Sequence, residues 1–239
     1  MLAAATAAAA PQDARADVWS SVGAFMDAGG VLMWPLLALA LLVPAVALVK
    51  IVQFSRLKVG DRAFVPAMLE LIRADRPAEA VRQLSGMKQP VARVMEAAVR
   101  GKANPRMSDE LVREETTRIA QAQLDGLERG LAVLTLVASI APLVGLLGTV
   151  TGLIQAFQQI SAAGSRVEPA TLAGGIWEAL LTTAAGLSIA IPAAIVATYL
   201  QRKVDVEAQH MEDAATQVFT APLWQAVEDA SDAQRVAAE

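Results

Sequence analysis

The stretch that decides the fold is ALLTTAAGLSIAIPAAIVATYL, residues 179–200, which contains no charged side chain. At about 1.5 Å per residue, a helix of this length can cross the roughly 30 Å hydrocarbon layer of a bilayer. Two further uncharged stretches, residues 31–49 and 130–159, precede it. Membrane β-strands would instead alternate apolar and polar residues over about ten positions. The three continuous blocks therefore predict an all-α membrane protein with three transmembrane helices.

The composition agrees with a membrane protein. Of the 239 residues, 55% are hydrophobic and 18% are charged, whereas about a quarter are charged in a typical soluble domain. The net charge of −4 does not favour a nucleic-acid partner. The chain has no cysteine, so disulfides and thiolate metal sites are excluded. We interpret the single histidine, His210, as a solvated surface residue, because it lies in a charged stretch.

Positive charge predicts the orientation, because Lys and Arg near the ends of spans stay on the cytoplasmic side. Residues 53–129 contain 14 Lys or Arg, and Arg202 and Lys203 follow the third span. The opposite side has only Arg15 and Arg166. We therefore expect residues 53–129 and the tail to be cytoplasmic in a bacterial inner membrane.

These boundaries predict seven segments. Residues 1–28 form a periplasmic segment, 29–52 the first transmembrane helix, 53–129 a cytoplasmic helical domain, 130–160 the second transmembrane helix, 161–169 a periplasmic loop, 170–201 the third transmembrane helix, and 202–239 a cytoplasmic helix and tail. The Ala-rich start lacks the positive region of a signal peptide. A periplasmic tail is thus favoured over the end of a cleaved signal.

The cytoplasmic domain should contain short helices separated by Pro, Gly and Ser residues. Pro77 and Pro90 are each suited to begin a helix, and Ser108 is suited to cap a third one. That third helix meets no obvious breaker and should continue as one long helix through the second span. The helix of the third span should likewise extend past Arg202 until Pro222 stops it. Two of the three membrane helices are therefore predicted to extend into the cytoplasmic domain.

Glu178 is the main candidate for a functional residue, because no other ionisable residue lies within the hydrophobic blocks. A charge at mid-bilayer costs about 2.5–3.5 kcal/mol on insertion scales, so such a residue usually faces a polar path or another chain. Reversible protonation would suit a carboxyl in that setting. The alternative is that Glu178 lies at the outer interface and simply begins a helix, since residues 179–200 can span without it.

Hydroxyl and small residues accompany Glu178. Thr182, Thr183 and Thr149 could relay protons or support water, or could simply bond back to their own helices. Small residues that would let membrane helices approach closely are Gly145, Gly148, Gly152 and Gly186. Pro142 and Pro192 are expected to kink their helices, and the carbonyls that they free could line a wet path.

Two motifs carry a family resemblance. The sequence ASIAPLVGLLGTVTGLIQAF, residues 138–157, closely resembles the second-helix signature of the ExbB/TolQ/MotA proton-channel family. The sequence GGIWEALLTTAAGLSIAIPAAI, residues 174–195, resembles its third-helix signature. The number of spans and the large first cytoplasmic region resemble the ExbB/TolQ branch, and APLVGLLGTV is most similar to ExbB.

The resemblance implies a homopentamer around a pore that holds an ExbD-like or TolR-like single-span partner. It implies that Glu178 is the pore glutamate, and that Thr149 and Thr183 are pore threonines. Two positions depart from the common pattern: Thr151 stands where many relatives have tryptophan, and Trp177 stands where many have alanine. Both positions lie near the pore that the resemblance implies, so we expect its wetting and shape to differ from those of close relatives.

The resemblance thus implies a proton-channel subunit that energises a TonB-like protein for outer-membrane transport. A TolQ-like subunit acting through a TolA-like protein is the nearest alternative, and a non-conducting membrane scaffold is a second. An enzyme is not expected, because the sequence has no nucleotide loop, HExxH helix or serine–histidine dyad, and we predict neither a cofactor nor a metal site.

Overall fold

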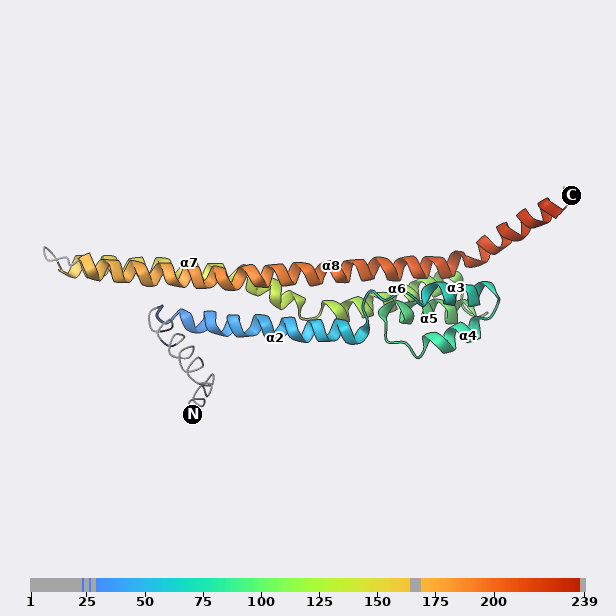
Figure 1. Cartoon of the computed structure of the whole chain (residues 1–239), viewed down its shortest axis with the longest axis horizontal. Coiled ribbons are helices and arrows are strands. Elements are labelled where there is room, and N and C mark those ends of the chain that lie inside the picture. The colour runs from blue at the N-terminus through green and yellow to red at the C-terminus, as the bar shows by residue number, and fades with distance from the viewer. Residues whose placement is uncertain (1–22, 24–25, 27–28, 164–168, 237–239) are drawn as a thin grey trace, which may run out of the picture. The chain divides into compact units, whose positions relative to one another are not determined.

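The computed structural model describes residues 23, 26, 29–163 and 169–236, and this part of the chain is helical without any strand. The helices are α2 (Met33–Leu57), α3 (Val65–Arg73), α4 (Pro77–Leu84), α5 (Pro90–Lys102), α6 (Asp109–Glu128), α7 (Leu131–Ala163) and α8 (Pro169–Val236). Figure 1 shows their order along the chain. The all-α prediction is confirmed. Most of the predicted periplasmic segment 1–28 and of the loop 161–169 lies outside the described residues.

Three helices of the described chain are long and apolar enough to cross a membrane. They are α2, most of α7 and, within α8, a stretch that begins at Ala173. The uncharged part of α8 ends at Leu200 and is followed by Arg202 and Lys203. The chain is therefore a membrane protein with three spans, as the sequence predicts, and α8 continues well beyond its apolar part.

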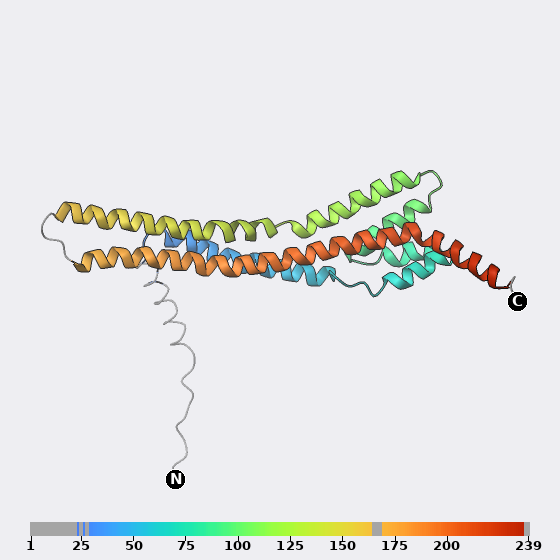
Figure 2. The same ribbon diagram turned by 90° about the horizontal axis from the view of Figure 1, so that it is seen from above.

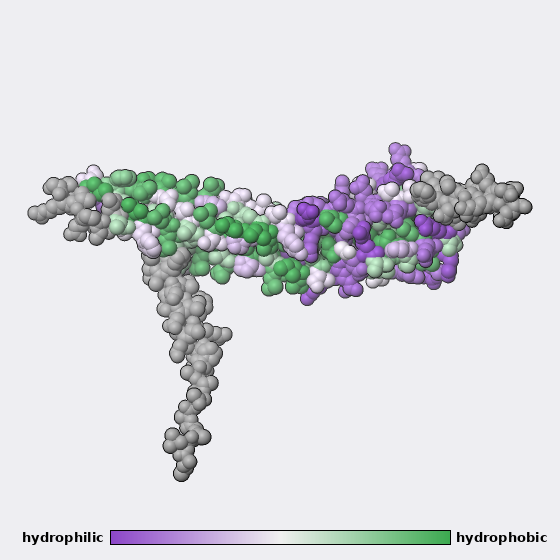
Figure 3. Space-filling view, turned by 45° about the horizontal axis from the view of Figure 1, so that its top comes forward, coloured by the Kyte–Doolittle hydropathy of each residue, from purple (hydrophilic) through white to green (hydrophobic). Residues whose placement is uncertain are grey.

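The chain divides into two compact units, each described here by itself. The first, which we call the apolar unit, comprises Met1–Ala45 and Thr135–Ala194, and the second, the polar unit, comprises Val46–Leu134 and Ile195–Glu239. In the space-filling view hydrophobic residues gather over the described part of one unit and hydrophilic residues over the other (Figure 3). Within the apolar unit, α7 and the first part of α8 lie side by side (Figure 2).

The core of the polar unit is built from large aliphatic side chains. Its fully buried members include Leu84 of α4, Met95 of α5 and Met211 of α8. Pro77 and Pro90 begin α4 and α5, as predicted, because a helix needs no N–H at its first position. The apolar stripes of these short helices meet one another, which buries surface that no single short helix could bury alone.

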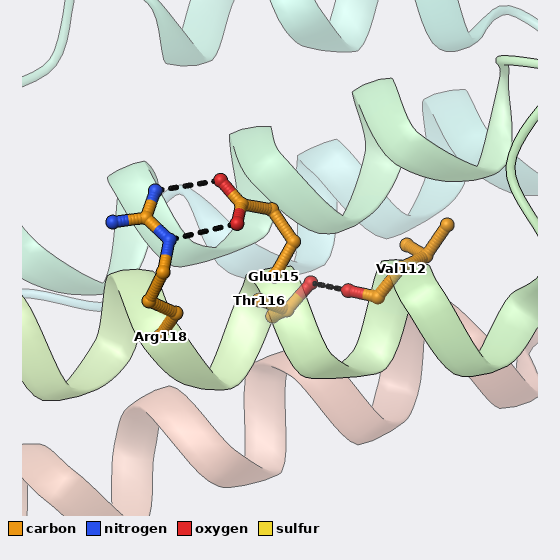
Figure 4. A network of polar contacts seen from close by, with 4 residues as sticks. All are labelled: Val112, Glu115, Thr116 and Arg118. Carbon is orange, nitrogen blue, oxygen red and sulfur yellow. Dashed lines mark hydrogen bonds and ion pairs between the residues drawn. The ribbon is translucent and has the colours of Figure 1, made fainter.

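Helix α6 carries the predicted cap and a row of local polar contacts. The Oγ of Ser108 accepts a hydrogen bond from the Leu111 N–H at 3.3 Å. The Arg118 guanidinium forms two parallel bonds to the Glu115 carboxylate, with nitrogen–oxygen distances of 2.6 and 2.7 Å (Figure 4). This pair is exposed to solvent, so it adds little to stability. It marks the water-facing side of α6.

The prediction of one helix from Ser108 through the second span is wrong. The chain leaves the helix at Arg129, and Gly130 adopts a φ of 91° before α7 begins. This left-handed conformation is easily adopted by glycine alone. The carbonyls at the end of α6 bond to α2 instead: Lys50 Nζ donates to the Leu127 oxygen at 2.7 Å, and Gln53 Nε2 donates to the Gly126 oxygen at 3.1 Å.

The prediction that Pro222 stops the last helix is also wrong, because α8 continues to Val236. An interior proline removes one N–H and leaves one carbonyl without its helical partner. The sequence that follows, LWQAVEDASDAQRV, contains no second breaker and is rich in residues that favour helices. The helix therefore resumes, although its ribbon bends towards the C-terminal end (Figure 1).

Candidate functional site

Small residues form the contact between α7 and α8 in the apolar unit. A Cβ atom added to Gly145 would lie 2.9 Å from the Thr183 Cα, and one added to Gly152 would lie 2.9 Å from the Ala179 Cβ. Real side chains do not approach so closely, so the two backbones are nearer than any larger residue would permit. This is the close approach that the glycine spacing predicts.

Gly186 of α8 faces α7 in the same manner. A Cβ added to Gly186 would lie 2.5 Å from the Ala141 oxygen. Pro142 follows directly, and α7 runs through it without interruption, as α8 does through Pro192. Neither proline donates an N–H, so the carbonyls of Ala138 and Ser188 lack their usual helical partners. Kinks at the two prolines remain predictions.

The three threonines bond to backbone carbonyls in different ways. The Thr183 hydroxyl crosses from α8 to α7 and donates to the Gly145 oxygen at 2.7 Å. The Thr182 hydroxyl is buried against Gly148 and donates to the Ala179 oxygen at 2.7 Å within α8. The Thr149 hydroxyl donates to the Leu146 oxygen at 2.7 Å within α7. Each hydroxyl oxygen keeps acceptor capacity, but its proton is already engaged.

Glu178 lies about one turn before Thr182 and Thr183 on α8 and is half-buried. Its carboxyl group contacts the backbone at Gly30, just before α2 begins. Trp177 beside it is 64% exposed. Thr151 on α7 donates to the Leu147 oxygen at 2.9 Å. The structure thus brings Glu178, Thr182 and Thr183 onto one stretch of α8, between the start of α2 and the glycines of α7.

Lys50 is a buried charged residue that the sequence patterns did not single out. It lies inside α2, just after the uncharged block, and is 3% exposed. Its ammonium donates to the Leu127 oxygen at 2.7 Å and to Gln53 Oε1 at 2.9 Å. A cation is favourable at the C-terminal end of a helix, where the carbonyls carry partial negative charge. Its partner on α6 is distant in sequence, so only the structure reveals this role.

Glu207 is a second missed residue, in the polar unit and seven residues beyond the uncharged stretch that ends at Leu200. It is 1% exposed, and its Oε2 accepts a hydrogen bond from the Gly60 N–H at 2.9 Å. Burial raises the pKa of its carboxyl, while the Gly60 bond and the neighbouring His210 and Arg62 lower it in part. The spacing of Val204, Glu207 and Met211 on one helical stripe was the signal available in the sequence.

The prediction that His210 is a solvated surface residue is wrong. Its side chain is 16% exposed, and its Nδ1 lies 3.5 Å from Glu207 Oε2. One turn of α8 separates the two residues, so they share a face that packs within the polar unit.

Among the described residues, no three His, Cys, Asp or Glu side chains lie close enough to hold a metal ion.

Comparison with known proteins identifies the class of membrane protein. The model of the MotA/TolQ/ExbB proton channel family matches residues 86–213, more than half of the chain. These residues include α5, α6, α7 and the part of α8 that carries Glu178 and the threonines. The chain therefore belongs to the MotA/TolQ/ExbB proton channel family.

Curated relatives point to one branch of this family. The chain is 35% identical over 191 residues to the biopolymer transport protein ExbB-like 1 of Synechocystis sp., an alignment covering 77% of this chain and 71% of the relative. It is 29% identical to an ExbB homologue of Methanothermobacter thermautotrophicus, covering 77% and 64%. It is 46% identical over 86 residues to the biopolymer transport protein exbB1 of Vibrio cholerae, covering 36% and 38%. The chain is thus most like ExbB.

Proposed function

We propose that the chain is an ExbB-like subunit of an inner-membrane proton channel that uses the proton-motive force to energise TonB-dependent transport across the outer membrane. The observation that carries the proposal is Glu178, an ionisable residue in an apolar helix that also carries the hydroxyl groups of Thr182 and Thr183. The chain belongs to a family of proton channels, which supports a role of this residue in proton passage. The relatives named as biopolymer transport proteins support the ExbB-type output over a TolQ-like one.

The proposed chemistry is proton passage along the polar stretch of α8. An unpaired charge in hydrocarbon is costly, so Glu178 should face water or a partner chain. Either of these could supply protons to its carboxyl group. Thr183 fixes α8 to α7 through the Gly145 carbonyl, and its oxygen can still accept a hydrogen bond from water. A membrane potential supplies about 2.3 kcal/mol per charge per 100 mV, so several protons supply mechanical work without nucleotide hydrolysis. The chain itself is not proposed to be an enzyme.

The proposed assembly is a homopentamer with an ExbD-like or TolR-like single-span partner, acting on a TonB-like or TolA-like protein. Glu178 is only half-buried in a single chain, and a carboxyl that faces lipid is costly, which supports an assembly in which further chains cover it. Native mass spectrometry in mild detergent should show five copies. A monomer as the sole stable species would contradict this assembly.

The proposed orientation places the N-terminus in the periplasm and the C-terminus in the cytoplasm. The positive charge of residues 53–129 supports it. A cysteine introduced by Lys88→Cys, at an exposed position between α4 and α5, should resist an impermeant thiol reagent in intact spheroplasts and react after lysis. Reaction in intact spheroplasts would reverse the orientation.

The functional test is uptake by a strain in which a variant replaces the native gene. Glu178→Ala should abolish energised uptake while the complex accumulates normally, because removing a costly carboxyl need not weaken the fold. Glu178→Gln retains size and hydrogen bonding and should fail as well if titration is required. Thr183→Val should impair uptake more mildly, since it removes one hydroxyl of a set. Normal uptake by Glu178→Ala at normal abundance would favour a non-conducting scaffold.

A further inference from the structure

Gly30 lies in the turn that precedes α2, and its backbone is left-handed, with a φ of 66°. Its carbonyl accepts a hydrogen bond from the Met33 N–H at 3.1 Å, which starts the helix. Residues with a Cβ rarely adopt this conformation. The turn alone therefore favours glycine at position 30.

A second requirement comes from α8. A Cβ atom added to Gly30 would occupy the space of the Glu178 carboxyl oxygen Oε1. The carboxyl group therefore rests directly on a backbone that has no side chain. Gly30 and Glu178 belong to the same compact unit, so this contact lies within one unit.

Other left-handed glycines of the described chain differ from Gly30 in this respect. A Cβ added to Gly60, with a φ of 90°, would meet nothing within 4 Å. One added to Gly130, with a φ of 91°, would meet Lys50 Cε at 3.5 Å, an ordinary contact. Among these glycines the left-handed conformation is thus shared, whereas the contact with the Glu178 carboxyl is particular to Gly30.

We propose that Gly30 is a positioning residue for Glu178: the missing side chain leaves the place in which the carboxyl group rests against the start of α2. A glutamate side chain has three rotatable bonds, and a residue with a Cβ at position 30 would turn the carboxyl to another rotamer. Through this contact the first membrane helix sets where the carboxyl of α8 lies. The inference rests on the proton-pathway role proposed for Glu178.

The first test measures the position of the carboxyl rather than transport. Membranes containing the full complex are treated with dicyclohexylcarbodiimide, and modification of Glu178 is followed by peptide mass spectrometry. Gly30→Ala should raise the modification rate of Glu178 by about threefold or more, because contacting residues couple on that scale and the displaced carboxyl is less covered. Gly60→Ala, which also places a Cβ at a left-handed position but without the contact, should leave the rate at Glu178 unchanged.

A second variant separates the contact from the strain. Asn tolerates left-handed backbone but is larger than Ala. Gly30→Asn should therefore fold at least as well as Gly30→Ala and still displace the carboxyl. An unchanged modification rate in both Gly30 variants would overturn the inference, and so would an equal rise in Gly60→Ala.

The third test is rescue. Asp is one methylene shorter than Glu, so Glu178→Asp makes room for a Cβ at position 30. Uptake by the double variant Gly30→Ala with Glu178→Asp, relative to wild type, should exceed the product of the relative uptakes of the two single variants by about threefold or more. Strictly multiplicative losses would contradict the contact. Failure of the proposed function is seen separately, as normal uptake by Glu178→Ala, and it leaves the labelling result intact.

Discussion

The α7–α8 contact of the apolar unit and the core of the polar unit are packed by opposite means. In the apolar unit, α7 and α8 meet through Gly145, Gly152 and Gly186, where the missing side chains bring the backbones together. In the polar unit, buried Leu84 and Met95 fill the space between helices. Lipid is as apolar as a leucine side chain, so burial of large side chains gives no driving force for association within the membrane. In water the same burial is the main stabilising contribution.

The largest expected effect is loss of a large side chain from the polar unit. Met95 is fully buried, so Met95→Ala should lower the free energy of unfolding by about 2–5 kcal/mol. Leu111 is 52% exposed, and Leu111→Ala should change it by no more than about 0.5 kcal/mol. Urea denaturation of the purified complex in detergent measures both. Equal losses would show that this core does not stabilise the fold.

The opposite change should be harmful in the apolar unit. Gly186→Ala places a Cβ against the Ala141 carbonyl and should destabilise the α7–α8 contact by about 1–3 kcal/mol. The matched control is Gly174→Ala in the same helix, where an added Cβ meets nothing within 4 Å. Thermal unfolding in detergent should give a lower Tm for the first variant only. A lowered Tm in both would point to glycine-specific backbone effects rather than packing.

A smaller effect should appear as a pH dependence in the polar unit. Burial raises the Glu207 pKa above its ordinary value of 4.5, so the neutral acid is the form that the fold favours. Its contribution to stability is present below that value and is lost as pH rises through the raised pKa. Gln cannot ionise, so the free energy of unfolding of Glu207→Gln should rise relative to that of the wild type as pH increases from 4.5 through the raised pKa of Glu207. Urea denaturation across this range gives the comparison, and parallel curves would contradict it.

Much of the fold could be predicted because it depends on local sequence. Uncharged runs predict the spans, and Pro77, Pro90 and Ser108 begin or cap helices through their own backbone chemistry. The break at Gly130 could not be predicted with the same means. It is accompanied by a bond from Lys50 to the Leu127 oxygen, and these residues lie 77 positions apart. The predicted end of the last helix at Pro222 was wrong, because a single proline does not end a helix when the residues that follow favour helix.

The candidate site was predictable in its residue types but not in its contacts. Glu178 and Thr183 follow from the rarity of polar residues in apolar helices. Their partners, the backbone at Gly30 and the Gly145 carbonyl, are distant in sequence, and no sequence pattern reveals which backbone group each side chain meets. Glu207 was overlooked, and His210 was wrongly predicted to be solvated because its surroundings in the sequence are charged, whereas the helical stripe turns both side chains inward.

Proton flux through the reconstituted complex tests the central claim most directly. The full complex with its partner is placed in liposomes, a membrane potential is imposed, and internal pH is followed with an entrapped dye. We expect flux above that of protein-free liposomes, and a loss of about tenfold or more for Glu178→Ala, since each 1.36 kcal/mol of barrier changes a rate tenfold. Equal flux for wild type and Glu178→Ala at equal protein density would contradict the proton-pathway role of Glu178.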